Sequence, residues 1–477
     1  IKVADKLTLD LPEAATGRRM GYVGPAAFVF NTSLRENILL GAMHQPLKEA
    51  TGEIIDSDEK KRNIRNAELS GNSLDDLQAD WVDYKAIGAN SDTELREKLL
   101  DLLKTVDLDG DTYDLGLRGT INPDENKVLA DRILAARKAL QKRLKQPEIS
   151  NSIELFDSEK FNSNASVAEN LLFGTPVGDD FILENIAENQ YVREILRETG
   201  LEEEFVRVGR DVASTMVELF ADLPADHEYF SQYSFIATDD IPEFQILLGR
   251  ADRLGLEAME EEDRNRFLAL PFKLIPARHR LDLITEPIID RILEARRKFA
   301  EKIPDDLRAA IEFFSEEKYN KSATLQDNIL FGKVASDKAN ASEQVGALIA
   351  EVIESENLRS IIVEVGLDFQ VGLSGSKLSP AQRQKICLAR ALVRCPDILI
   401  LNEATSALDS GSQTKVMSNI MAATKGRNLL WVLQRVALAV PFDRVMVMSG
   451  GRVVETGGFE ELKGKADSAL NNLLRDE

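Results

Sequence analysis

The sequence is poor in the residues that build metal centres and disulfide frameworks, with 2 cysteines and 3 histidines among 477 residues. Cys387 and Cys395 have no second pair and no histidine beside them, so they match no zinc-binding pattern. We expect two structural thiols in a reducing compartment. The histidines are scattered and indicate neither a metal site nor a catalytic triad; they are His44, His227 and His279.

Positive charge is also scarce, because 59 lysines and arginines face 81 aspartates and glutamates, which gives a net charge of -22. A nucleic-acid partner normally requires a basic face, so this balance argues against one. It gives no support for binding to an anionic membrane surface either, and an acidic surface is mainly a feature of solubility. Apolar residues make up 43% of the chain, which is enough for a sizeable core.

Long apolar runs are missing as well: we find neither a run of transmembrane length nor a signal peptide. The chain begins at Ile1 rather than at a methionine, which suggests a processed or cropped chain with further motifs upstream. At 477 residues it exceeds one ordinary domain.

Internal repeats organise the middle of the chain. FDSEKFNSNASVAENLLFG (156–174) matches FSEEKYNKSATLQDNILFG (314–332), and DRILAARK (131–138) matches DRILEARR (290–297). The two offsets, 158 and 159 residues, are almost equal and indicate a duplicated block. A weaker third copy of the first pair is FVFNTSLRENILLGA (28–42), where Ser33 and Glu36 predict a helix with a capping box. Each copy then reaches a similar step, at 106–119, 199–209 and 365–375.

The ends of the chain differ in character from the mainly helical, charged middle. Apolar runs predict strands at 18–24, 397–402 and 428–434, and the run 445–455 predicts a hairpin. Gly450 and Gly451 can supply the positive φ that its two-residue turn needs. Strand, helix, strand and hairpin in this order predict an α/β layer.

The most informative run is LSPAQRQKICLARALVRCPDILILNEATSALD (378–409), which resembles the signature helix, Walker B strand and D-loop of ATP-binding cassette (ABC) proteins. A serine at a helix N-terminus, with free amides and the helix dipole, suits a γ-phosphate. A carboxylate at the end of a buried strand can reach Mg²⁺ or an attacking water. The resemblance implies that Ser379 and Gln382 hold signature positions, that Glu403 orients water and that Asp409 lies at a dimer interface.

Two further runs resemble exporter-type cassettes: 21–41 resembles the Q-loop segment, and 432–462 resembles the switch loop and C-terminal hairpin. Departures from the family pattern fall on several site positions. Pro25 stands for the Q-loop glutamine, Asn402 for the Walker B aspartate that holds Mg²⁺, and Gln434 for the switch histidine. Asn402 is a weaker partner for Mg²⁺, and Gln434 cannot act as an acid or base. The two signature glycines are Pro380 and Ala381, which hinder close approach to a phosphate.

The Walker A motif G-x4-G-K-[ST] does not occur in the sequence, and we expect it upstream. GLSGSKLS (372–379) has the wrong spacing and is predicted as the turn before the signature helix. The predicted fold is therefore an α/β, P-loop NTPase-like ABC core that lacks its Walker A part and carries a large, mainly helical insertion. Its regions are the start of the core (1–41), the repeated insertion (42–312), the helical copy leading to the signature (313–375) and the C-terminal core (376–477).

The resemblance implies the ATP-binding part of an export-type transporter, with ATP and Mg²⁺ as cofactors. The implied partners are a second cassette in a head-to-tail dimer and a transmembrane permease domain in the same full-length chain, at the cytoplasmic face of the inner membrane. The departures leave a second hypothesis open: a non-hydrolysing cassette that acts as a regulatory or structural partner. A chromosome-maintenance or repair ATPase is disfavoured, because the insertion lacks the sustained heptads of a coiled coil.

Overall fold

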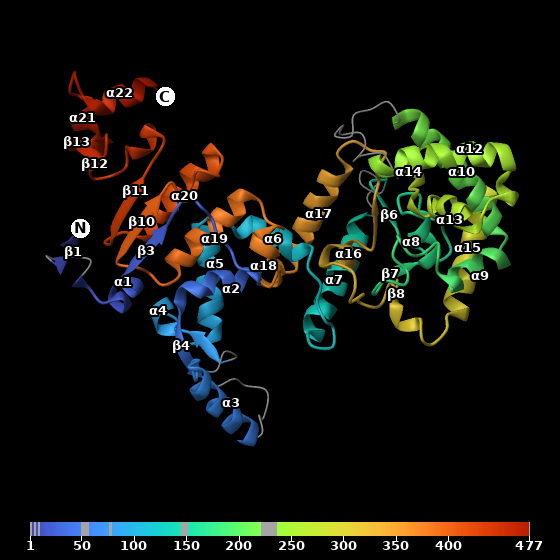
Figure 1. Cartoon of the computed structure of the whole chain (residues 1–477), viewed down its shortest axis with the longest axis horizontal. Helices are drawn as coiled ribbons and strands as arrows, with labels where there is room; N and C mark the ends of the chain where they lie inside the picture. The colour runs from blue at the N-terminus through green and yellow to red at the C-terminus, as the bar shows by residue number, and fades with distance from the viewer. Residues whose placement is uncertain are drawn as a thin grey trace. The chain divides into compact units, whose positions relative to one another are not determined.

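The computed structural model describes residues 2–3, 6–7, 10–48, 57–75, 79–144, 151–220 and 236–476, so His227 lies outside the described residues. The chain forms two compact units, which are described separately (Figure 1). Unit 1 comprises residues 1–116 and 360–477, and unit 2 comprises residues 117–359. The division between the units falls after Gly116, and the start of the insertion at residue 42 stays a prediction.

A parallel sheet of three strands is the centre of unit 1. β10 (Ile398–Asn402) lies in the middle and pairs in parallel with β3 (Met20–Val23) on one side and β11 (Asn428–Val432) on the other. Leu399 and Leu401 of β10 are fully buried. The predicted strands at 18–24, 397–402 and 428–434 are therefore confirmed, and segments almost 400 residues apart in sequence share one sheet.

Short elements follow the sheet at the C-terminal end of unit 1. β12 (Val445–Ser449) and β13 (Arg452–Gly457) form the predicted antiparallel hairpin, and Gly450 and Gly451 have φ values of 58° and 77°. The hairpin packs with α21 (Phe459–Lys463) and α22 (Ala469–Asp476) around a small core of its own. The remaining strands of unit 1 are β1 (Lys2–Val3) with β2 (Lys6–Leu7), and β4 (Met43–Lys48) with β5 (Asp80–Val82).

Helices complete unit 1. α19 (Pro380–Leu392) contacts both α2 (Leu34–Leu39) and β3, and α20 (Ser410–Ala423) contacts α5 (Asp92–Thr105). The predicted capping box at the start of α2 is confirmed, with Ser33 and Glu36 bonded reciprocally. The other helices are α1 (Glu13–Arg19), α3 (Ser57–Ser70), α4 (Tyr84–Ile87), α6 (Asp109–Leu117) and α18 (Arg359–Leu367), of which α18 enters unit 1 at residue 360.

Two glycines allow α6 and α18 to lie very close together. A Cβ atom on Gly116 would meet the carbonyl oxygen of Ile362, and one on Gly366 would meet that of Thr112. Neither position can therefore hold a side chain without moving a helix backbone. The chain leaves unit 1 just after Gly116 and returns at residue 360, so exit and return occur at this helix contact.

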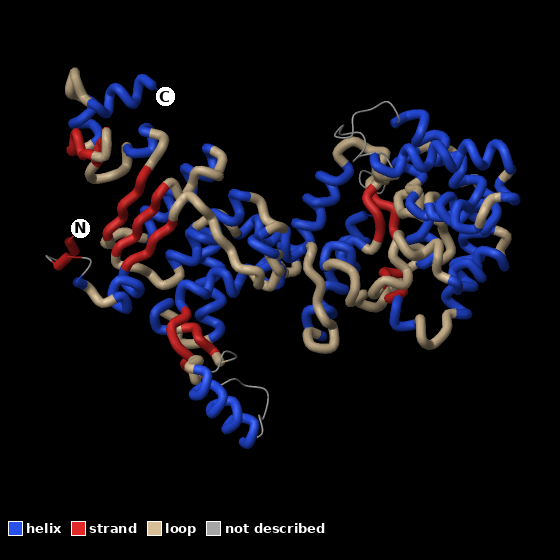
Figure 2. Tube along the Cα trace, in the orientation of Figure 1, coloured by secondary structure: helices blue, strands red, loops and turns tan. Residues whose placement is uncertain are grey.

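Unit 2 is mainly helical, and its few strands are short (Figure 2). Its strands are β6 (Ile153–Leu155), β7 (Gly174–Pro176), β8 (Ile311–Phe313) and β9 (Gly332–Val334). Its longer helices are α7 (Lys127–Leu144), α9 (Gln190–Glu198), α10 (Leu201–Phe220), α12 (Ile241–Leu254), α13 (Glu261–Ala269), α15 (Glu286–Lys302) and α17 (Ala341–Ser355). Its shorter helices are α8 (Val167–Leu172), α14 (Pro276–His279) and α16 (Leu325–Leu330). The predicted helix at 128–144 is confirmed as α7.

The two strong repeats of unit 2 face one another. The strand before each repeat pairs with the strand after the other, as β6 with β9 and β7 with β8. The amide of Phe156 donates to the carbonyl of Phe331, and that of Phe314 donates to the carbonyl of Phe173. The rings of Phe156 and Phe314 stack with centroids 4.3 Å apart. These reciprocal contacts make the two repeats an internal dimer of the isologous kind.

Each of the three repeats is locked by one arginine on one asparagine. The arginine Nε donates to the backbone carbonyl of the asparagine, and Nη2 donates to its side-chain oxygen. The locks are Arg390 on Asn37, Arg296 on Asn170, and Arg137 on Asn328. Because Arg390 belongs to the signature helix α19, the matching runs DRILAARK and DRILEARR in α7 and α15 are further copies of that helix.

The locks also show which copies pair. In chain order the repeats are 28–42, 156–174 and 314–332, and the corresponding helices are α7, α15 and α19. The middle repeat pairs with its own helix, α15, whereas the first pairs with α19 and the third with α7. The first repeat therefore forms unit 1 with the signature helix, and the other two form unit 2.

A corner between two helices recurs in each copy. Asp107, Gly200 and Asn357 have φ values of 57°, 69° and 53°, the left-handed region that a tight corner requires. Each corner carbonyl accepts a hydrogen bond from a basic side chain five residues before a locking arginine; the donors are Lys385, Arg291 and Arg132. For the third copy, the sequence predicted this corner at 365–375. The residue with the corner conformation is Asn357, which lies before that run.

Candidate functional site

Ser379 and Gln382 form the N-terminal cap of α19. The Ser379 hydroxyl accepts from the Gln382 amide at 3.2 Å, and the Gln382 Oε1 accepts from the Ser379 amide at 2.9 Å. Buried Leu378 anchors the chain before the cap, and Pro380 suits the first helical position because its missing N–H has no partner there. The predicted turn at 372–379 is present, and Ser379 itself is exposed. An exposed hydroxyl at a helix N-terminus can meet an anion.

Glu403 and Gln434 lie together beyond the ends of two neighbouring strands. The Gln434 Nε2 donates to the Glu403 Oε2 at 2.7 Å. The Glu403 amide donates to the carbonyl of Val432 at 3.2 Å, which places this residue beside β11. Its φ of 52° is unusual for a residue with a long side chain, and such strain is typical of functional turns. The arrangement holds one carboxylate in a fixed orientation beside an amide that cannot titrate.

Asn402 ends β10 directly before Glu403. Its Nδ2 donates to the hydroxyl of Tyr22 from β3, at 3.4 Å. The amide is held by its nitrogen, so its oxygen can act as a neutral ligand. Within the described ranges, no cluster of three or more histidine, cysteine, aspartate or glutamate side chains could hold a metal. Mg²⁺ bound to a nucleotide commonly needs only one or two protein oxygens beside phosphates and water, so the side-chain oxygen of Asn402 fits this ion.

Gln384 connects the signature helix to the turn after β10. Its side chain is buried, and its Nε2 donates to the Glu403 carbonyl at 3.2 Å and to the Ser406 hydroxyl at 3.3 Å. Its Oε1 accepts from the Ala407 amide at 2.8 Å. Sequence analysis matched this stretch to the family pattern without assigning Gln384 a contact. The structure makes it the residue that fixes the turn bearing Glu403.

Asp409 caps α20, the helix that follows the D-loop. Its Oδ1 accepts from the amides of Ser412 at 3.0 Å and Gly411 at 2.9 Å. These bonds, that of Ser412 above all, hold the pKa of Asp409 below its ordinary value. The carboxylate therefore remains ionised and bound to its own helix.

Pro25 lies in the loop after β3. It is exposed and lines a cavity of about 470 Å³ together with Tyr22, Phe28, Cys387 and Arg390. The cavity is bounded by the first repeat and by the signature helix. Burial raises the pKa of the Cys387 thiol, so this residue is a structural rather than a reactive cysteine.

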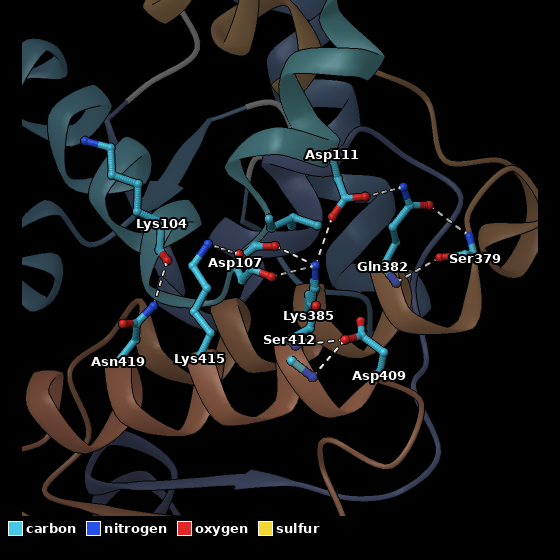
Figure 3. Close-up of polar contacts among 12 residues, drawn as sticks. Lys104, Asp107, Asp111, Ser379, Gln382, Lys385, Asp409, Ser412, Lys415 and Asn419 are labelled. Carbon is cyan, nitrogen blue, oxygen red and sulfur yellow. Dashed lines mark hydrogen bonds and ion pairs between the residues drawn. The ribbon is translucent and has the colours of Figure 1, made fainter. Parts of the chain in front are cut away.

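A charged cluster that was not predicted from the sequence lies at the α5–α6 corner (Figure 3). Lys385 of α19 donates to the Asp107 carbonyl at 2.5 Å and to the Asp111 Oδ2 at 3.1 Å. Lys415 of α20 reaches the Asp107 Oδ1 at 2.5 Å. Burial opposes ionisation of Asp107, but Lys415 and Lys385 outweigh it, and the pKa of Asp107 lies below its ordinary value. Asp111 also accepts from the Gln382 Nε2 at 3.0 Å.

Comparison with known proteins finds relatives of one family. The family model described as ABC transporter matches residues 283–406. The chain is 37% identical over 191 residues to the ABC multidrug transporter mdr2 of Aspergillus fumigatus, which covers 39% of this chain and 23% of that protein. It is 36% identical over 160 residues to the heterocyst differentiation ATP-binding protein HepA of Nostoc, covering 33% and 25%. It is 35% identical over 179 residues to the ATP-dependent lipid A-core flippase of Ralstonia nicotianae, covering 37% and 29%.

The chain thus contains an ABC transporter nucleotide-binding domain, with mixed helix and strand content. This ATP-binding domain is homologous to those of exporters that couple ATP use to transport. The chain spans about a quarter of the length of these curated relatives. A solved structure of a bacterial Atm1-family ABC exporter with ATP bound matches 23% of this chain and 19% of that chain, at 30% identity and a TM-score of 0.22, too low to carry weight. Among the helices described here, none combines the length and apolar character needed to cross a membrane.

Proposed function

We propose that this chain is the ATP-binding part of an exporter-type ABC transporter, in which ATP binding and hydrolysis drive transport across a membrane. The observation that carries the proposal is the 2.7 Å bond between Glu403 and Gln434 at the ends of β10 and β11. It brings together the residues that stand at the general-base and switch positions of the resemblance. The exposed Ser379 cap supports the proposal from the signature side.

In the proposed reaction Glu403 orients the attacking water and accepts its proton, because it is the carboxylate at the end of the central strand. Gln434 holds that carboxylate and reaches the γ-phosphate through its amide without supplying proton chemistry. Bound Mg²⁺ would neutralise phosphate charge, with Asn402 as its ligand from this chain.

The proposal includes a second cassette as partner. Ser379 and its helix dipole would contact a γ-phosphate held by that second cassette, in a head-to-tail dimer, and Asp409 would lie at the dimer interface. The Walker A motif would come from sequence outside this chain, because no stretch of the 477 residues completes it. A transmembrane permease domain in the same full-length chain would place the cassette at the cytoplasmic face of the inner membrane. The cavity lined by Pro25 and Phe28 is the concave surface that this proposal assigns to the permease contact.

A second candidate function is a cassette that binds ATP and pairs without hydrolysing it. It is favoured by the neutral amide of Asn402 at the magnesium position and by Pro380 and Ala381 at the signature glycines. In that case Gln434 would hold Glu403 without releasing it to a water, and hydrolysis would occur at the partner's site.

The deciding experiment measures ATP turnover by the complete polypeptide, including its upstream segment, reconstituted in membrane. The variants are Glu403→Gln and Asn402→Asp, with Gln434→His as the third. We expect turnover on the order of 1 s⁻¹ that Glu403→Gln abolishes. A fourth variant combines Asn402→Asp with Gln434→His. No turnover in the parent, with ATP still bound and turnover restored in this double variant, would establish the non-hydrolysing cassette instead.

A further inference from the structure

Asp111 stands beside the signature cap without belonging to any motif. It lies at the start of α6, in the helix pair that follows the first repeat, and its Oδ1 accepts from the Gln382 Nε2 at 3.0 Å (Figure 3). We propose that Asp111 is a positioning residue for the signature: it fixes the orientation of Gln382, and through it the hydroxyl of Ser379. The proposal deepens the ATPase function proposed above and rests on it for its consequence, though not for its first test.

The oxygen and the nitrogen of the Gln382 side-chain amide have different partners. Its Oε1 must face the Ser379 amide to close the cap, and its Nε2 must then find an acceptor elsewhere. A carboxylate can only accept, so Asp111 selects this orientation and disfavours the flipped one. The Ser379 hydroxyl accepts from the Gln382 backbone amide at 3.2 Å, so both bonds of the cap join the same two residues.

A negative charge beside a phosphate-binding cap would weaken the cap unless it were neutralised. Lys385 supplies the neutralisation, because its nearly buried ammonium lies 3.1 Å from the Asp111 Oδ2. The same ammonium donates to the Asp107 carbonyl, so the corner holds the lysine from two sides. Asp111 therefore acts as a hydrogen-bond acceptor in a paired, rather than a free, ionic state.

The corner also joins the helix that begins at the D-loop. Asp107 binds Lys415 of α20 through its Oδ1, and the Asn419 side chain donates to the Lys104 carbonyl at 3.2 Å. The helices that begin with Ser379 and Asp409 are thus tied to one corner. We infer that the two residues which would face the partner cassette are held in a fixed relation by Asp107 and Asp111.

Unit 2 contains a natural control for this inference. At the equivalent corner, Arg291 lies 3.4 Å from the Glu204 carboxylate and donates to the Gly200 carbonyl. The cap position of α15, Thr285, makes no side-chain cap bond, and the position of Gln382 is occupied by buried Ile288. The ionic contact is therefore retained where no cap depends on it.

The first test is hydrogen exchange in the complete chain without nucleotide, comparing Asp111→Ala with Glu204→Ala. In Asp111→Ala we expect exchange of the Ser379 backbone amide, which donates to the Gln382 Oε1, to rise about tenfold, the size expected for loss of a charge-assisted bond. In Glu204→Ala this amide should be unchanged. Asp111→Asn is the conservative variant, and it should restore most of the protection because its amide oxygen can still accept from Gln382.

The second test follows ATP turnover of the same variants in the complete, membrane-reconstituted polypeptide. Asp111→Ala should raise the KM for ATP about tenfold with a smaller change in kcat, because the cap binds phosphate and does no chemistry. Glu204→Ala should leave both constants unchanged.

Unchanged exchange of the Ser379 backbone amide in Asp111→Ala would overturn the inference, whatever happens to turnover. Equal acceleration in Asp111→Ala and Glu204→Ala would overturn it as well, because it would indicate general destabilisation. Selective acceleration, combined with a parent that has no turnover, would support the positioning role while it contradicts the proposed ATPase function. The two failures are therefore distinguishable.

Discussion

The helix pairs α2 with α19 in unit 1 and α8 with α15 in unit 2 have the same lock and different N-terminal caps. Both contain an arginine that donates to the carbonyl and side chain of one asparagine, and Arg296 is buried whereas Arg390 is half-buried. Of the two arginine-bearing helices, α19 begins with a closed capping box, whereas α15 begins at Thr285 with no side-chain cap bond. Packing has thus been retained in both copies, because a buried guanidinium without partners is costly. The closed cap, to which we assign phosphate binding, is present in one.

The largest expected effect comes from breaking the lock in one unit. Arg296→Met leaves the carbonyls of Asn170, Asp157 and Ser158 without their donor, and we expect a loss of about 3–5 kcal/mol in the free energy of unfolding of unit 2. Hydrogen exchange resolved by segment measures it. Arg390→Met is the matched control and should destabilise unit 1 instead; a loss spread equally over both units would contradict separate locks.

The next effect concerns the aromatic contact between the two repeats of unit 2. Phe156→Ala should cost about 2 kcal/mol, and so should Phe314→Ala, because each removes a partly buried ring from the stack. The double variant should cost about 1 kcal/mol less than the sum of the single changes, since the stack is lost only once. Chemical denaturation of the four proteins gives the coupling. Strict additivity would show that the two rings stabilise unit 2 independently.

A pH effect separates unit 2 from unit 1. Burial, aided by Arg278, lowers the pKa of His279 from 6.5 to about 4, and its Nδ1 accepts from the Ile275 amide at 2.9 Å. Because the folded pKa is depressed, the stabilisation is fully present above pH 6.5 and is lost as the pH falls towards 4. We expect a loss of about 1–2 kcal/mol in unit 2, reduced by partial exposure. His279→Asn keeps an acceptor and should remove this part of the pH dependence; an unaltered pH profile would refute the assignment.

The smallest effect compares the two caps directly. Ser379→Ala should lower stability by about 1 kcal/mol, whereas Thr285→Ala should change it by only about 0.2 kcal/mol, because Thr285 makes no cap bond. Thermal unfolding followed by segment-resolved exchange measures both. Equal costs would mean that the two helix starts differ less than their hydrogen bonds indicate.

Local patterns carried most of what could be predicted from the sequence. The strands of the sheet, the hairpin at Gly450 and Gly451, the Ser33 cap and helix α7 follow from periodicity and turn chemistry within a few residues. Ser379, Gln382, Glu403 and Gln434 were identified from motif spacing, and the structure brings the first two into one cap and the last two into one hydrogen bond. Their chemical roles stay predictions.

Pairing between copies could not be predicted, because all three copies carry the same arginine and asparagine. No local sequence feature distinguishes Asn328 from Asn37 or Asn170 as the partner of Arg137. The same limit hid Asp111, whose partner Gln382 is 271 residues away in sequence. The signal that could have revealed the corner is the spacing of five residues between Lys385 and Arg390, repeated in Arg132–Arg137 and Arg291–Arg296.

The contact of α6 with α18 at Gly116 and Gly366 has a consequence for how such a gene can grow or shrink. The chain leaves and re-enters unit 1 at one helix crossing. A copy of the repeat could therefore be inserted or deleted at this crossing without changing the strand order of the sheet. Closing a long loop whose ends already touch costs little, since the entropy grows only slowly with loop length.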